Sequence, residues 1–189
     1  LVEISGGELP TWHMLHGYAA WRSGELEEAK TAYEKAVTLY ETWKKETKAN
    51  MSECDGLMRA YSFLTVIYND LGDSEGAESM LTKMATAKHT RKSSATYAMY
   101  EWNQQLLKSK ILFAKSVAGD KTALSKAIKE LPKIQAADEN LSHLNKVIKG
   151  YQAYALGLKH FQDGKLPESL KMASELGKII NEVKGMAND

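Results

Sequence analysis

Two histidines, His13 and His16, come nearest in this sequence to an arrangement that could do chemistry. On a helix, residues three apart lie on one side, so both imidazoles could face one metal ion. No carboxylate or third histidine adjoins them in the sequence, whereas a zinc site needs at least three protein ligands. We therefore interpret the pair as packing or surface histidines, and the sequence predicts no metal site.

Other reactive groups are equally isolated. Cys54 is the only cysteine, so it cannot form an intramolecular disulfide, and a nucleophilic role would need a neighbouring histidine and an activating environment. The acidic pairs Glu27-Glu28 and Asp138-Glu139 fit solvated helix faces or helix starts. The chain has no glycine-rich phosphate loop, no Gly-x-Ser-x-Gly elbow and no Cys-x-x-Cys motif. The sequence therefore predicts a protein that is not an enzyme and needs no cofactor.

Composition narrows the class of partner. The 189 residues fit one domain, and the formal net charge of +1 gives no reason to expect nucleic acid. No apolar run reaches 18 residues, so no membrane span is expected. The chain begins Leu1-Val2-Glu3, which suggests a mature form or a piece of a longer protein. We expect a soluble protein, and its location, cytoplasmic or exported, stays open.

Four glycines at nearly constant spacing divide the chain. They are Gly24, Gly72, Gly119 and Gly164, which lie 48, 47 and 45 residues apart, each between two runs with apolar residues at helical spacing. Glycine accepts the left-handed conformation that ends a helix, and a regular period of this length is typical of stacked helical repeats. Eight helices are predicted, near residues 11–23, 26–48, 53–71, 74–89, 94–118, 121–131, 139–163 and 166–185.

The predicted fold is all-α. Short loops make successive helices antiparallel, so the eight helices form four hairpins near 11–48, 53–89, 94–131 and 139–185. A hairpin alone buries only part of its apolar surface, and stacking against its neighbours buries the rest. We therefore expect one repeat domain over residues 1–189, an α-solenoid.

The residues around the first glycine resemble a tetratricopeptide repeat. Gly17 lies in the first helix, Gly24 marks the turn, and Leu26, Ala29, Tyr33 and Ala36 follow in the second helix. The second repeat resembles the pattern in its first helix, and the fourth repeat resembles it more weakly. The third repeat keeps only the size of the apolar side chains and their helical spacing. The usual repeat has about 34 residues, so the longer period here indicates long helices. The resemblance implies a right-handed superhelix.

The resemblance also implies a concave groove lined by the first helix of each hairpin. The positions carried over to this groove include Tyr18, Trp21, Arg22, Arg59, Asn69, Phe113, Tyr151, Tyr154 and Phe161. Tyr18 and Val66 stand where asparagines of a carboxylate-binding clamp would be expected, which argues against that clamp. An aromatic lining suits an apolar segment or amphipathic helix of a partner. The alternative is that these aromatics pack internally.

The function predicted from these observations is a non-catalytic scaffold that binds a protein or peptide in an aromatic groove. One alternative is a helical module of a transport, secretion or envelope assembly, which could hold a ligand. Another is an accessory domain of a larger enzyme. Association through the terminal repeats is a further expectation that the sequence leaves open.

Overall fold

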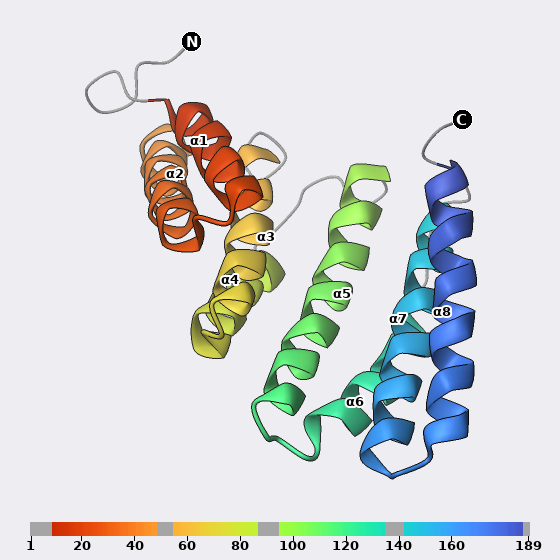
Figure 1. The fold of residues 1–189 in the computed structure, drawn as a ribbon. Coiled ribbons are helices and arrows are strands. Elements are labelled where there is room, and N and C mark those ends of the chain that lie inside the picture. The colour runs from red at the N-terminus through yellow and green to blue at the C-terminus, as the bar shows by residue number, and fades with distance from the viewer. Residues whose placement is uncertain (1–8, 49–54, 87–94, 135–141, 187–189) are drawn as a thin grey trace. The chain divides into compact units, whose positions relative to one another are not determined.

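The computed structural model describes residues 9–48, 55–86, 95–134 and 142–186, and every regular element in these ranges is helical (Figure 1). The elements are α1 (Pro10–Ser23), α2 (Leu26–Thr47), α3 (Asp55–Asp70), α4 (Ser74–Thr86), α5 (Ala95–Val117), α6 (Ala123–Glu130), the 3₁₀ turn η1 (Leu131–Lys133), α7 (Ser142–Gln162) and α8 (Leu166–Met186). Each helix end lies within three residues of its predicted position. The all-α fold built from helical hairpins is thus confirmed.

One type of turn closes all four hairpins. Gly24, Gly72, Gly119 and Gly164 have φ angles of 85°, 78°, 107° and 75°, in the left-handed region. In each turn the glycine N–H donates to the carbonyl three residues back, and the next N–H donates to the carbonyl five residues back, as in Glu25 N to Ala20 O at 2.9 Å. This pattern caps the last carbonyls of the first helix. The periodic glycines therefore set the hairpin boundaries.

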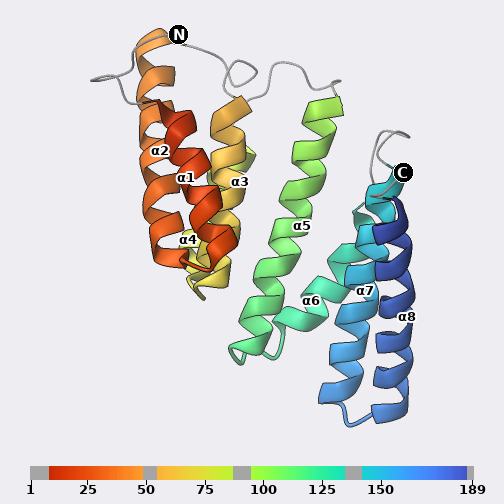
Figure 2. The same cartoon turned by 45° about the horizontal axis from the view of Figure 1, so that its top comes forward.

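The chain divides into two compact units, Leu1–Tyr100 and Glu101–Asp189, and the division falls inside α5. The first unit holds the hairpins α1/α2 and α3/α4. The second holds α6, η1, the hairpin α7/α8 and most of α5. Figure 2 shows the two helices of α1/α2 and of α7/α8 side by side within their units. The single domain over residues 1–189 stays a prediction.

The core of the first unit is built around Tyr33. Its ring is buried, stacks on Phe63 of α3 with centroids 5.4 Å apart, and lies against Gly17 of α1. Two tyrosine hydroxyls of α3 donate to carboxylates of α2: Tyr68 to Glu34 at 2.6 Å and Tyr61 to Glu41 at 2.7 Å. α2 and α3 are therefore joined by apolar packing and by hydrogen bonds.

The core of the second unit lies among α5, α6 and α7. Its buried members are Trp102, Leu106, Phe113, Leu124, Ala127, Leu131, Ile134, Ile148 and Ala155. Helix α8 packs on α7, where a Cβ atom at Gly157 would lie 3.2 Å from Met172 Cβ. The apolar residues of α8 were expected to pack as one stripe, but Leu170 is 71% exposed and Ile180 is half exposed. The reason is that α7 covers only one side of a broad apolar surface.

Candidate functional site: an apolar groove along α7 and α8

A cavity of the second unit, which we call the main cavity, lies between α7 and α8. It has a volume of about 420 Å³ and is lined by Val147, Gly150, Tyr151, Tyr154, Leu176, Ile179, Ile180, Val183 and Lys184. Volumes of this size are typical of ligand and partner pockets. Its lining is apolar apart from the two tyrosine hydroxyls and the Lys184 ammonium. The cavity can therefore bind apolar groups and offers one positive charge.

A second cavity of about 220 Å³ continues the first along the same hairpin. Its lining residues are Ala153, Tyr154, Gly157, Leu158, Phe161, Ser169, Met172, Ala173 and Leu176. Tyr154 and Leu176 line both cavities, so the two adjoin at these side chains. Together they form a groove, which we call the α7/α8 groove, running along α7 from Val147 to Phe161.

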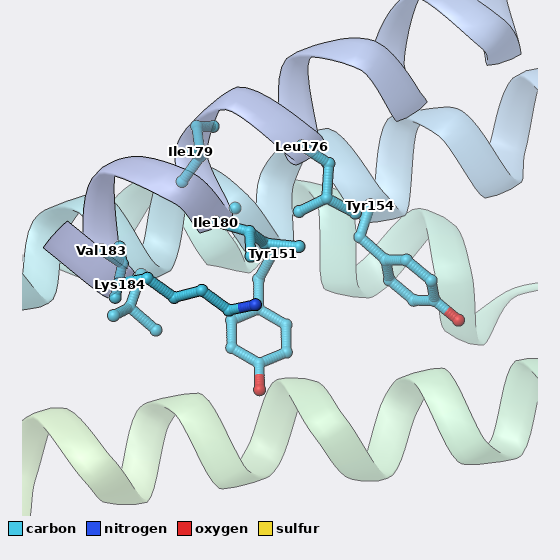
Figure 3. Close-up of a pocket in the computed structure, with 9 residues that line it drawn as sticks. Tyr151, Tyr154, Leu176, Ile179, Ile180, Val183 and Lys184 are labelled. Atoms are coloured by element: carbon cyan, nitrogen blue, oxygen red, sulfur yellow. The ribbon is translucent and has the colours of Figure 1, made fainter.

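Helix α8 and two tyrosines of α7 form the sides of the main cavity. In Figure 3, the side chains of Leu176, Ile179 and Ile180 extend from α8, and the rings of Tyr151 and Tyr154 lie across from them. Leucine, isoleucine and valine on α8 supply branched surface that cannot hydrogen-bond. An occupant would therefore gain free energy mainly by removing apolar surface from water.

Phe113 of α5 supports both tyrosines. Its ring stacks on Tyr151 with centroids 6.3 Å apart and meets Tyr154 edge-on at 5.6 Å. Lys110 of α5 places its ammonium 5.5 Å from the centroid of the Tyr151 ring, a cation–π contact. Phe113 itself is buried, so it does not face solvent as a lining residue would. It holds in place the two aromatic rings that do line the groove.

Small residues on α7 leave room for the groove. A Cβ atom at Gly150 would lie 3.5 Å from Ile179 Cγ2 and 3.6 Å from Leu176 Cδ1, which is ordinary van der Waals distance. An alanine would therefore fit at position 150 without a steric clash. The missing side chain is part of the space in the main cavity.

The structure divides the predicted groove residues between the two units. In the second unit, Tyr151, Tyr154 and Phe161 all line the α7/α8 groove, and Phe161 is 62% exposed. Phe113 also lies in the second unit but is buried, and the other five positions, Tyr18, Trp21, Arg22, Arg59 and Asn69, lie in the first unit.

In the first unit, two of the predicted aromatics form a cluster on Phe63. Tyr18 and Trp21 meet the Phe63 ring edge-on at 5.9 and 6.1 Å. The indole Nε1 of Trp21 also donates to Asp70 Oδ2 at 3.1 Å, which joins α1 to α3. Tyr18 remains 43% exposed, so its outer surface is accessible while its edge packs.

The polar positions of the first unit differ from one another. Arg22 and Arg59 are exposed, and Arg59 hydrogen-bonds Tyr100. Asn69 is half-buried, and its Oδ1 atom meets no donor among the described residues.

Sequence reasoning missed the α8 side of the groove. Leu176, Ile179, Ile180 and Val183 were interpreted as hairpin packing or left unassigned, because one helical stripe does not show how much of it a neighbour covers. One signal was present: apolar residues on α8 extend round more of the helix than a single partner helix can cover. The additional apolar residues therefore indicate a part of the α8 surface that α7 leaves exposed.

The predicted absence of a metal centre concerned the paired histidines. His16 Nε2 lies 2.9 Å from Glu28 Oε1 on α2, a carboxylate that the sequence alone did not bring close. Within the described ranges no three histidine, cysteine or acidic side chains are grouped to hold a metal ion. Cys54 lies outside the described residues. None of the described helices combines the length and apolar character that crossing a membrane requires.

Comparison with known proteins gives one result. Residues 13–42, which span the hairpin α1/α2, match the family model of the tetratricopeptide repeat. No curated protein and no solved structure matches the chain. The matched residues include Gly17, Gly24, Ala29 and Tyr33. The match covers 30 of the 189 residues, and it supports the resemblance of the hairpin α1/α2 to a tetratricopeptide repeat.

Proposed function

We propose that this protein is a non-catalytic interaction module that binds an amphipathic helix of a partner protein in the α7/α8 groove. Tetratricopeptide repeats are in general protein-interaction modules, which supports the class of function. The observation that carries the finer proposal is the pair of adjoining apolar cavities that share Tyr154 and Leu176. A row of two apolar cavities suits a partner that presents apolar side chains in a row.

The length of the groove fits a helix. From Val147 to Phe161 the groove follows 15 residues of α7, and the 14 steps between the first and the last span roughly 21 Å at 1.5 Å per residue. A partner helix of about four turns would cover this distance and present apolar residues at positions i, i+3, i+4 and i+7. Tyr151 and Tyr154 are already held by Phe113, so binding would cost little further side-chain entropy.

Charge gives the partner a direction. Among the residues that line the two cavities, Lys184 is the charged one, and it lies at the end of the groove beyond Val183. An acidic side chain on the partner would pair with this ammonium at the rim. Such rim pairs add more to orientation and association rate than to affinity. We therefore expect a mainly apolar partner stripe with an acidic residue at one end.

The test is a peptide selection on the folded protein. A displayed library of random 16-residue segments is selected on the wild-type chain, after removal of segments that bind the double variant Tyr154→Ser/Lys184→Glu. Enriched peptides should have an apolar stripe at helical spacing and an acidic residue near one end. Enrichment of peptides without such a stripe, or failure to enrich any peptide, would contradict the proposal.

Binding of one enriched peptide to single variants locates the site. Tyr154→Ser should weaken binding at least tenfold, about the loss of one well-packed aromatic contact. Leu156→Ser is the matched control, because Leu156 is a partly exposed apolar residue of α7 outside both cavities. It should change the Kd less than twofold. If Tyr154→Ser lost helicity, Lys184→Glu, on an exposed side chain, would serve instead and should weaken binding about threefold.

A further inference from the structure

A second apolar face of α8 adjoins the α7/α8 groove and shares Ala173 and Ile180 with its lining. Leu166, Leu170, Ala173, Gly177 and Ile180 follow one another at steps of three and four residues, and all are exposed. Leu170 and Gly177 line neither cavity, and a Cβ atom at Gly177 would meet no atom within 4 Å. A glycine inside a helix costs stability relative to alanine. No described neighbour in the chain accounts for this one.

In the first unit, the face of α2 that is equivalent to this face of α8 packs against α3. Aligning the turn glycines Gly24 and Gly164 places each α2 residue 140 positions before its α8 equivalent. The α2 residues that contact α3 include Lys30, Tyr33, Glu34, Tyr40 and Glu41. Their α8 equivalents are Leu170, Ala173, Ser174, Ile180 and Asn181, and all five are exposed. The exposed face of α8 is therefore equivalent to the face of α2 that joins the first hairpin to the second.

The first helix of the chain carries the complementary exposed face. Aligning Gly24 with Gly72 places each α1 residue 48 positions before its α3 equivalent. Trp12, Leu15 and Ala19 are exposed on α1, whereas the equivalent α3 residues Ala60, Phe63 and Ile67 are buried or half-buried. Trp12 is 67% exposed and Leu15 is 59% exposed. The face of α1 that is equivalent to this packed face of α3 is thus exposed to solvent.

We propose that two copies of the chain associate head to tail, with α1 of one copy packed on the exposed face of α8 of the other. The contact would repeat the packing of α2 on α3, and this continuity with an existing interface argues for a second copy as the occupant. The two faces meet in a heterologous interface, which uses different surfaces on the two copies.

The side chains of the two faces are complementary in size. The stacking of Tyr33 on Phe63 and the packing of Tyr40 on Gly56 set the register of α2 on α3. Transferred to the equivalent positions, this register puts Trp12 of one copy over Gly177 of the other, and Leu170 over Ala19. A large side chain thus meets a small residue at both points. The empty space above Gly177 would receive an indole ring.

Charge does not oppose this contact. Leu170, Ala173, Ser174, Gly177, Ile180 and Asn181 on α8 carry no charge, and neither do Trp12, Leu15 and Ala19 on α1. Packing these nine residues against one another therefore desolvates no ionised side chain. One helix on one helix lies at the small end of protein interfaces. We expect association in the micromolar range, with dimers first and longer chains or rings at higher concentration.

The experiment is sedimentation or light scattering of the full chain across a concentration series. Wild type should increase in mass as concentration rises through the micromolar range. Trp12→Glu removes the α1 face and Leu170→Glu removes the α8 face, and each variant alone should stay monomeric. Their equimolar mixture should form a heterodimer and nothing larger, because one intact face remains on each copy. Leu156→Glu, on α7, is the control and should associate as wild type does.

Three results would overturn the proposal. One is a wild-type chain that stays monomeric over the whole series. A second is a Trp12→Glu variant that still dimerises by itself, which would indicate a symmetric α8–α8 contact. The third is a mixture of the two variants that fails to form a heterodimer although both keep their helicity by circular dichroism. Tyr154→Ser should leave self-association unchanged, so failure of this proposal and failure of the groove proposal are distinguishable.

Discussion

The Tyr33 ring on α2 fills the space that a side chain at Gly17 on α1 would need: a Cβ atom there would lie 2.6 Å from Tyr33 Cδ2. Tyr33 cannot move away freely, because its other face stacks on Phe63. We predict that Gly17→Ala destabilises the chain by about 1–2 kcal/mol, since overpacking outweighs the helix propensity gained. Chemical denaturation measures this change. An increase in stability would contradict the close approach of α1 and α2.

Gly177→Ala is the matched substitution with the opposite expected sign. Both glycines lie inside helices, but Gly177 has open space where the methyl group would go. The chain should therefore gain about 0.5–1 kcal/mol from helix propensity alone. The same denaturation experiment, run at a concentration where the chain is monomeric, tests this prediction. A loss of stability would mean that an unrecognised neighbour occupies that space.

Alkaline pH should weaken the first unit through Tyr33. Burial, with a smaller effect of Tyr18, raises the pKa of the Tyr33 hydroxyl to about 12 from an ordinary value of 10.0. A raised phenol pKa means that folding favours the neutral form. The stabilisation is therefore complete below pH 10 and is lost as pH rises from 10 to 12. Tyr33→Phe keeps the ring stack but should lose less stability than wild type over this interval in denaturant titrations.

Acidic pH should act through Glu41. Burial raises the pKa of this carboxyl, but hydrogen bonds from Lys83 at 2.8 Å and Tyr61 at 2.7 Å outweigh burial and lower it below 4.5. A lowered pKa means stability that is present above the unfolded value and lost as pH falls through the folded one. Wild type should therefore exceed Glu41→Gln in thermal stability at pH 7 by more than at pH 3. An equal difference at both values would contradict the ionised hydrogen-bonded state of Glu41.

The sequence was sufficient to predict the helices and their turns. Gly24, Gly72, Gly119 and Gly164 could be recognised because a left-handed residue between two amphipathic runs is a local requirement, visible in a few neighbouring residues. The packing role of Tyr33 followed from its spacing to small residues.

The concave groove expected from the repeat pattern, lined by the first helix of each hairpin, stays a prediction, because it depends on which faces have neighbours. Tyr151, Tyr154 and Phe161 were expected to line it and lie along the α7/α8 groove, whereas Phe113 is buried against Tyr151 and Tyr154. Helical period places Phe113 on a face of α5 and the other three on a face of α7, but it does not say which side chain another ring covers. The right-handed superhelix of the whole chain stays a prediction.

Methyl NMR of the chain with an enriched amphipathic peptide tests the central claim most directly. The methyl groups of Leu176, Ile179, Ile180 and Val183 line the main cavity, while those of Ile111 and Leu124 are buried in the core of the same unit. Our account predicts saturable shifts at the first set and at most small shifts at the second. Shifts that spare these four groove residues, or that occur only in residues of the first unit, would contradict it.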